Sequence, residues 1–140
     1  RLTRRFSAVP NLTLRDETIT RYSKDSLQNG MLGISNTLRI VAPLYLMCSP
    51  RDIAVIYQVK SPITDKPTLI IYDNSSGGIG LAEKAYHMRD TLLRHARQLI
   101  NDCGCERGCP SCVGPENEIG SDGKQTALKL LEEVMQYERS

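Results

Sequence analysis

The chain has 140 residues, a formal net charge of +2 and a composition that is 40% hydrophobic and 5% aromatic. This length suits a single domain with one modest core. No apolar run approaches the roughly 20 residues that a helix needs to span a bilayer, so we expect no membrane partner. The five cysteines, four of them clustered, favour a reducing, cytoplasmic context. Because it begins with Arg-Leu-Thr and no methionine, the chain looks like a piece of a longer protein.

The charge is distributed unevenly along the chain. Residues 1–24 contain six Lys or Arg and two acidic residues, whereas residues 76–140 contain eight and ten. The basic N-terminal segment could meet nucleic acid or an acidic partner, but we favour a solvated or partner-covered strand. Its partial alternation of apolar and polar residues predicts one or two edge strands, with the best of them at Thr18–Tyr22.

A helical period begins at Ser26 and runs to Cys48. Apolar residues recur at three- and four-residue steps, as on the buried face of an amphipathic helix: Leu27, Met31, Ile34, Leu38, Val41, Ala42, Tyr45 and Leu46. Ser26 or Asp25 can cap the N-terminus of this helix. Pro43 lacks a backbone N–H, so we expect a kink or a break near Val41–Ala42. Cys48 is expected on the buried side, as a small hydrophobe rather than a metal ligand.

Two strands are predicted next. The first is the β-branched stretch Ile53–Lys60, and the second is Thr68–Asp73, which is apolar enough to be a central strand buried on both faces. The short, turn-rich connection between them predicts an antiparallel hairpin.

A glycine-rich turn, Asp73–Gly80, then leads into a helix at Leu81. Free N–H groups at such a turn can bind a phosphate, and Gly77 and Gly78 are candidates for contacting DNA there. The turn matches no nucleotide-binding motif, however. We favour the interpretation that both glycines only provide positive φ angles and close helix–sheet packing.

The clearest predicted helix runs from Leu81 to Asn101. Its basic residues lie largely outside the apolar stripe and could follow a DNA backbone, although such a run is more often a solvated face: Lys84, Arg89, Arg94 and Arg97. His87 and His95 have no evident acid or nucleophile partner, so we interpret both as surface or boundary residues.

Four cysteines fall within ten residues in the pattern C-x-C-x3-C-x2-C: Cys103, Cys105, Cys109 and Cys112. Four thiolates without a nearby histidine are typical of a closed, tetrahedral, structural Zn²⁺ site, which leaves no open position for catalysis. An iron–sulfur cluster is chemically possible, and disulfides would need an oxidising compartment and strained bridges. We favour zinc.

Residues 113–123 are predicted to be a polar loop, and Lys124–Arg139 resume a helical period. The predicted fold class is α+β: a small, mainly antiparallel sheet packed with about three helices, plus a four-cysteine zinc knuckle between the last two helices. We divide the chain into the basic segment 1–24, which adds edge strands to the same domain, and a zinc-binding domain at 25–140.

Two motifs in this order resemble a known family. Asp73-x3-Gly77-Gly78-Ile79-Gly80-Leu81-Ala82-Glu83, then a helix, then Cys-x-Cys-x3-Cys-Pro-Ser-Cys-Val are similar to the zinc-binding C-terminal domain of MrfA-type helicases. The stretch 42–52 also resembles that family. These are DEAD/DEAH-like superfamily-2 DNA helicases associated with the repair of mitomycin-type damage. The resemblance covers residues 18–135, and in the family the four cysteines hold zinc.

The resemblance implies a parent enzyme that uses ATP and Mg²⁺ to translocate on DNA. The chain contains no phosphate loop or acidic ATPase motif that we can place, so we expect it to be non-catalytic and without a small-molecule substrate. Its expected role is to pack against the helicase core of the same polypeptide and to guide DNA, with single strands as the expected form. The alternative is a zinc-stapled interaction module that recruits a repair partner without contacting DNA.

Overall fold

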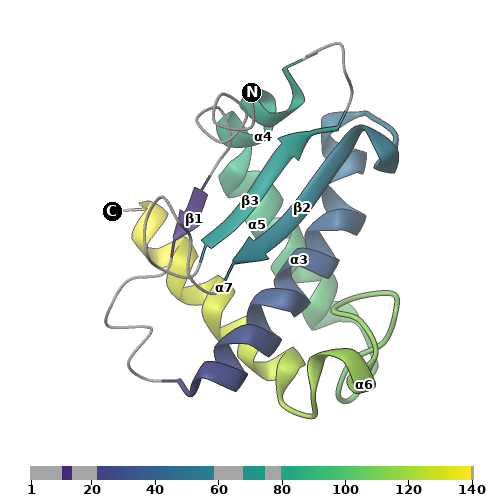
Figure 1. The fold of residues 1–140 in the computed structure, drawn as a ribbon, viewed down its shortest axis with the longest axis vertical. Coiled ribbons are helices and arrows are strands. Elements are labelled where there is room, and N and C mark those ends of the chain that lie inside the picture. Colours follow the sequence, from purple (N-terminus) through teal and green to yellow (C-terminus); the bar gives the residue numbers. More distant parts are fainter. Residues whose placement is uncertain (1–10, 14–21, 59–67, 75–79, 140) are drawn as a thin grey trace.

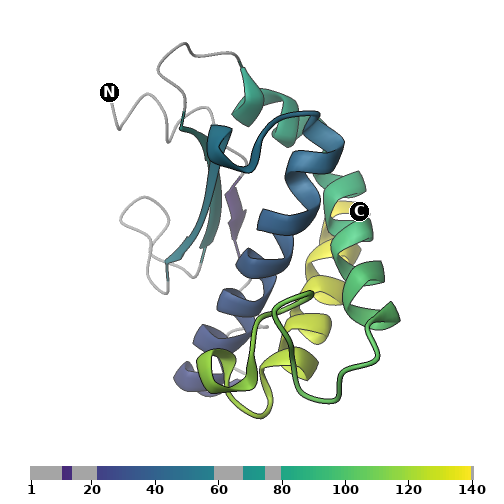
Figure 2. The same ribbon diagram turned by 90° about the vertical axis from the view of Figure 1, so that its right-hand side faces the viewer.

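The computed structural model describes residues 11–13, 22–58, 68–74 and 80–139. A three-stranded antiparallel sheet of β1 (Asn11–Thr13), β2 (Ile53–Gln58) and β3 (Thr68–Asp73) has the order β1–β3–β2. The three long helices gather on one side of this sheet (Figures 1 and 2). The predicted α+β class, the antiparallel pairing of the two main strands and the central place of the second are confirmed.

The two faces of the sheet belong to different clusters of buried residues. Val55 and Ile71, which are paired in register, join the main core on the helical side. Ile70 points the other way and packs with Ala82 of α4 (Leu81–His87). Because β3 is buried on both faces along most of its length, it reads as a continuous apolar run in the sequence.

The central helix of the domain is α3 (Lys24–Leu46), which contacts strand β2 and all four of the other α-helices in the described part of the chain. The helix was predicted, but its expected start was wrong, and of the kink or break expected near Pro43 the break does not occur. Its N-cap is Ser23, whose hydroxyl accepts the N–H of Ser26, so the helix starts a little earlier than expected. Pro43 does not break it: the helix continues to Leu46, and buried packing of Ala42, Pro43 and Leu46 offsets the missing hydrogen bond.

The single helix predicted at Leu81–Asn101 is also wrong, because the structure has two helices there. The first is α4, and the second is α5 (Arg89–Asp102), with Met88 between them in a non-helical conformation. The N–H of Met88 is still satisfied by the carbonyl of Lys84. The apolar residues keep a helical spacing across Met88, so the sequence pattern does not reveal the interruption between the two helices.

The C-terminal part contains one helix more than expected. Residues 113–123 were predicted as a polar loop, but they include the one-turn helix α6 (Glu116–Ile119) and the fully buried side chains of Val113 and Ile119. The last helix, α7 (Gly123–Arg139), agrees with the prediction and packs along α3 and α5. None of the helices in the described part of the chain combines the length and apolarity needed to cross a membrane.

Close packing of α3 on α7 depends on glycine. A Cβ added at Gly30 would lie 2.7 Å from Cγ2 of Thr126 and 2.8 Å from Cδ1 of Leu130. The two helices therefore approach more closely there than any side chain would allow. The strand predicted at 18–22 falls almost entirely outside the described residues, as do Gly77 and Gly78.

Candidate metal centre

The cysteine cluster starts where α5 ends. Asp102 is the last residue of α5, and Cys103 caps the helix by donating its N–H to the carbonyl of Leu99. A tight turn follows at the second cysteine pair, where the N–H groups of Cys112 and Gly114 both donate to the carbonyl of Cys109. Two hydrogen bonds to one carbonyl bend the chain so that the thiols of Cys109 and Cys112 point the same way.

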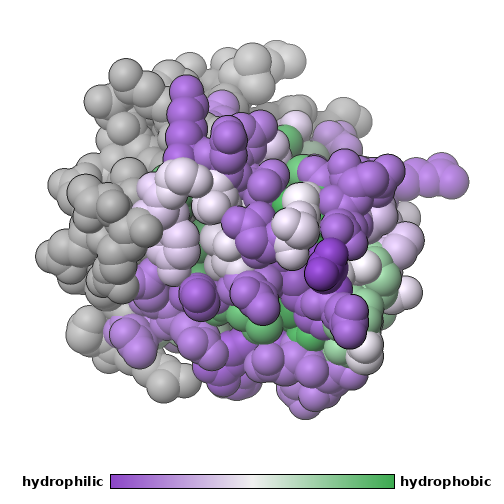
Figure 3. All heavy atoms as spheres, turned by 90° about the horizontal axis from the view of Figure 1, so that it is seen from below, coloured by the Kyte–Doolittle hydropathy of each residue, from purple (hydrophilic) through white to green (hydrophobic). Residues whose placement is uncertain are grey.

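Glycine permits the return of this loop. Gly108 has a φ angle of 131°, and a Cβ there would lie 2.5 Å from the carbonyl oxygen of Gly114. Only glycine accommodates both the positive φ and this contact between backbones. The loop closes against α6, at the end of the molecule seen in Figure 3, where the surface is mainly hydrophilic.

The four sulfurs are close enough to share one ion. The Sγ–Sγ separations are 3.5 Å for Cys103–Cys105, 3.4 Å for Cys103–Cys109, 3.5 Å for Cys105–Cys112 and 3.7 Å for Cys109–Cys112. All four lie within 4.8 Å of one another. A tetrahedron with Zn–S bonds of about 2.3 Å has edges of about 3.8 Å, so this donor set fits a single four-coordinate zinc ion.

The same distances weigh against the other interpretations. A disulfide requires an S–S distance of about 2.05 Å, and all five cysteines are free thiols in the structure. An iron–sulfur cluster distributes its thiolates over several irons, which would hold the sulfurs further apart than around one ion. Cys48 is half-buried against the main core and lies outside the four-cysteine group, as predicted.

Burial and hydrogen bonding make the thiols unequal. Burial raises the pKa of the Cys112 thiol to about 12. Burial also pushes the pKa of Cys105 upward, but hydrogen bonds from Cys112 and Lys124 outweigh it and lower that pKa to about 6. The cluster therefore favours a thiolate at Cys105, the sulfur nearest to the Lys124 ammonium.

Lys124 is a site residue that the sequence pattern missed. Its Nζ donates to the carbonyl oxygens of Cys103, at 3.2 Å, and Cys105, and it lies 3.3 Å from the Sγ of Cys105. The residue stands 19 positions after Cys105, at the start of α7. Only its position one residue after Gly123, at the end of the polar loop, marks it in the sequence, and that signal is weak.

Two polar side chains of α3 also hold the loop. The hydroxyl of Thr37 donates to the carbonyl of Cys112 at 3.1 Å, and Nδ2 of Asn36 donates to the carbonyl of Val113 at 3.0 Å. Both contacts join residues that are more than 70 positions apart. The loop is therefore fixed by hydrogen bonds to α3 and α7 as well as by the cysteines.

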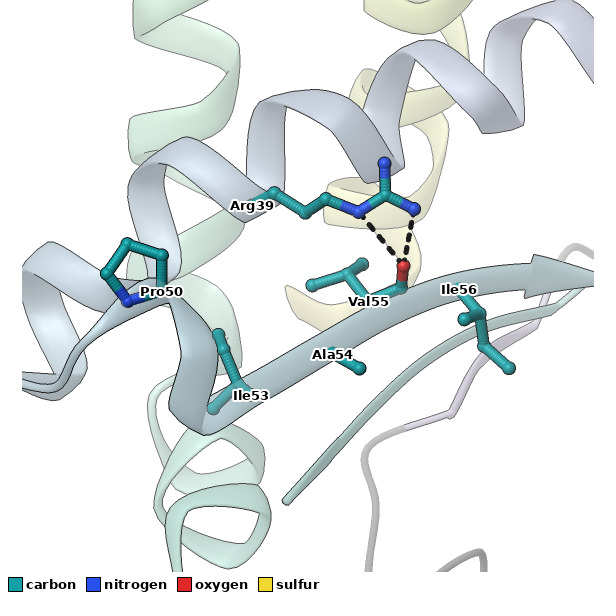
Figure 4. A pocket seen from close by; sticks show the side chains of 6 residues that line it. All are labelled: Arg39, Pro50, Ile53, Ala54, Val55 and Ile56. Carbon is teal, nitrogen blue, oxygen red and sulfur yellow. Dashed lines mark hydrogen bonds between the residues drawn. The ribbon is translucent and has the colours of Figure 1, made fainter. Parts of the chain in front are cut away.

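A hydrogen-bonded chain continues from Asn36 to the sheet. Nη1 of Arg39 donates to Oδ1 of Asn36 at 2.8 Å, and its Nε and Nη2 donate to the carbonyl of Val55 at 3.2 and 2.8 Å. Arg39 thereby lines a hollow of about 310 Å³ beside β2, together with Pro50 and residues 53–56 (Figure 4). Among the described strands β2 lies at the edge of the sheet, and the guanidinium occupies one of its carbonyl groups.

The predicted DNA-contacting residues do not share one helix. Lys84 is on α4, and its Nζ donates to the carbonyl of Leu46 at 3.3 Å. Arg89, at the start of α5, donates to the carbonyl of Tyr86 and lies 4.3 Å from the centre of that ring. Arg94 is exposed and Arg97 half-buried further along α5. Lys84 and Arg89 thus have structural contacts of their own.

Four convergent thiols at one end of a small α+β domain define a metal-binding domain with a closed centre. The chain belongs to the MrfA Zn-binding domain family, whose model matches residues 34–113. That segment contains most of α3, β2, β3, α4, α5 and the complete cysteine cluster. The cofactor of this domain is therefore zinc.

Relatives carry the same domain in proteins of very different length. The chain is 42% identical over 109 residues to "Uncharacterized ATP-dependent helicase YprA" of Bacillus subtilis (strain 168), a match that covers 78% of the chain and 14% of that protein. It is 29% identical to "Uncharacterized protein MJ1572.1" of Methanocaldococcus jannaschii, over 75% of the chain and 99% of that protein.

A crystal structure of the DUF1998 helicase MrfA bound to DNA has the same fold. It matches with a TM-score of 0.74 and 41% identity, over 81% of this chain and 15% of the MrfA chain. The chain thus spans only about a seventh of the length of the helicases that it matches.

Proposed function

We propose that Cys103, Cys105, Cys109 and Cys112 are the ligands of one structural zinc ion, in a non-catalytic domain of an ATP-dependent DNA repair helicase. The observation that carries the proposal is the convergence of four Sγ atoms within 4.8 Å, in a chain of the MrfA Zn-binding domain family. A reducing, cytoplasmic compartment belongs to the proposal, because thiolate ligands must stay reduced.

The role of the zinc in this proposal is to fix the chain between helices. Four protein ligands fill a tetrahedral coordination sphere and leave no position for water or substrate. Cys103 continues directly from α5, while Cys112 is tied to α3 through Thr37. One ion would therefore join the end of α5 to a loop that is hydrogen-bonded to α3. The ATP and Mg²⁺ of the parent enzyme would bind in its helicase core.

The proposed partners are the helicase core of the same polypeptide and DNA, with single-stranded DNA as the form contacted. Support comes from the DNA complex of MrfA, which contains the same fold, and from the exposed Arg94 and half-buried Arg97 of α5. Arg94 and Arg97 are better candidates than Lys84 and Arg89, whose polar atoms already bond to backbone carbonyls. Gly77 and Gly78 remain candidates from the sequence.

The zinc ligands are tested by single substitutions. Cys109→Ser and Cys112→Ser should each release the metal and loosen residues 100–124, because a structural site contributes its binding energy to folding. The matched control is Cys48→Ser, which removes a half-buried thiol outside the cluster and should leave about one zinc per chain. Elemental analysis measures the outcome. Full zinc content in Cys109→Ser or Cys112→Ser would show that a ligand is misassigned.

The DNA role is tested by the salt dependence of binding to a fluorescent single-stranded oligonucleotide. Neutralising Arg94 and Arg97 to Gln should weaken binding and reduce the slope of log affinity against log salt by about one for each phosphate that the chain no longer neutralises. The control, Arg51→Gln with Lys129→Gln, removes the same charge from exposed positions on η1 (Pro50–Asp52) and α7.

Two results together would refute the DNA role. One is absence of oligonucleotide binding by the chain even at low salt. The other is normal unwinding by the longer helicase with both arginines neutralised. The domain would then be an interaction module that recruits a protein partner.

A further inference from the structure

The side chain of Lys124 is buried at a position whose surroundings disfavour a positive charge. Its exposed fraction is 9%, although lysine is almost never buried without a partner. It is the second residue of α7, where the partial positive charge of the helix N-terminus opposes a cation. Its position therefore has an electrostatic cost that something nearby must offset.

The contacts of Lys124 all lie on the cysteine loop. An ammonium group has three N–H donors, and the three acceptors are the carbonyls of Cys103 and Cys105 and the Sγ of Cys105. The hydrogen bonds are thus complete. Within the described part of the chain, no carboxylate makes an ion pair with this ammonium, and among its contacts the Sγ of Cys105 is the group that can carry a negative charge.

A zinc ion bound by four thiolates would supply that balance. Four thiolate charges exceed the double charge of zinc, so such a site has a formal net charge of about −2. A neighbouring ammonium would reduce it to about −1. The negative charge of the centre would offset the cost of burying the ammonium, and the ammonium would offset the cost of burying that negative charge.

We propose that Lys124 is a positioning residue of the zinc centre, which offsets the charge of the four thiolates and holds residues 103–105 against the start of α7. This inference rests on the zinc ligation proposed above. The bond to Sγ stabilises the lone pairs of Cys105, and the bonds to two carbonyls link the first half of the knuckle to α7. Through Lys124, the zinc joins the last helix of the domain, to which no cysteine belongs.

The test compares zinc and cobalt binding in variants of the 140-residue chain. Lys124→Met keeps the length of the side chain and removes its charge and its donors, whereas Lys124→Arg keeps the charge. Loss of a hydrogen-bonding partner around a metal site lowers affinity by about 10- to 100-fold, so Lys124→Met should bind zinc that much more weakly in competition with a chromogenic chelator. Lys129→Met, on the exposed side of α7, is the matched control and should leave the affinity unchanged.

Cobalt provides a readout that a change in packing alone would not move. In the cobalt-substituted chain, removing a cation from a thiolate raises the energy of the sulfur lone pairs. Lys124→Met should therefore shift the sulfur-to-cobalt charge-transfer band to lower energy, while the d–d bands keep their tetrahedral pattern. Lys124→Arg should return the charge-transfer band towards its original position.

The outcomes separate this inference from the zinc ligation. If the unsubstituted chain gives no four-thiolate cobalt spectrum, the ligation itself is wrong, and this inference fails with it. If the spectrum is present but Lys124→Met matches it in affinity and band position, only the role of Lys124 is overturned. A weaker affinity with an unmoved band also overturns it, because Lys124 would then contribute packing alone. If circular dichroism shows Lys124→Met to be unfolded, Lys124→Gln gives the same comparison.

Discussion

Thr37→Val tests whether the cysteine loop is held by α3 as well as by metal. Thr37 is fully buried, and its hydroxyl donates to the carbonyl of Cys112 at 3.1 Å and to that of Gly33 at 2.9 Å. Valine has nearly the same shape, so the substitution removes the hydrogen bond without opening a cavity. A buried carbonyl left without its donor costs about 1–3 kcal/mol. Since the single hydroxyl proton is shared between two carbonyls, we expect the lower part of that range, about 1–2 kcal/mol.

The assay is urea unfolding of the zinc-saturated chain, with the free energy of unfolding as the readout. The matched control is Ser35→Ala, also fully buried on α3, whose hydroxyl donates only to the carbonyl of Leu32 in the same helix. We expect this control to lower the free energy of unfolding by less than about 0.5 kcal/mol, because the carbonyl keeps its helical partner. Equal effects of Thr37→Val and Ser35→Ala would show that the hydrogen bond from Thr37 to the loop contributes nothing of its own to stability.

Two further predictions concern close packing and metal removal. Gly30→Ala should lower the free energy of unfolding by about 1–3 kcal/mol in the same urea assay, because its Cβ would lie 2.7 Å from Cγ2 of Thr126. The control is Gly104→Ala, whose Cβ would have no neighbour within 4 Å; it should change the free energy of unfolding by less than about 0.5 kcal/mol. Equal effects would contradict the close approach of α3 and α7. Removal of zinc with a chelator should speed hydrogen exchange at the amides of Cys112 and Gly114 more than in the β2–β3 ladder; uniform acceleration would show that the metal does not act locally.

Local patterns in the sequence were sufficient for much of the fold. The two main strands differ from their flanks in β-branched and apolar content, and α7 carries a helical period along its length. The cysteine cluster could be recognised because its four members lie within ten residues. In each case the signal and the structure that it indicates occupy the same short stretch of chain.

Features set by contacts between distant segments could not be predicted in this way. Pro43 stays helical because the domain core packs around it, and the chain turns at Met88 although the apolar period continues. Thr37 and Lys124 reach the cysteine loop from 75 and 19 residues away. Nothing near Thr37 in the sequence marks it as part of the site, and for Lys124 the sequence offers only the weak signal of its position after Gly123.

For the basic residues, the sequence pattern suggested a common surface that the structure does not have. Lys84, Arg89, Arg94 and Arg97 resemble one basic face when their stretch is taken as a single helix. The structure divides them between α4 and α5 and engages two of them with backbone carbonyls. Charge alone therefore could not separate residues that hold the fold from residues that are free to meet a partner.

The most direct test of the metal centre is X-ray absorption at the zinc edge, combined with elemental analysis of the purified chain. We expect about one zinc per chain, bound by four sulfurs at about 2.3 Å with no nitrogen or oxygen ligand. A coordination shell that contains nitrogen or oxygen, or a chain that purifies without zinc, would contradict a closed site made of Cys103, Cys105, Cys109 and Cys112.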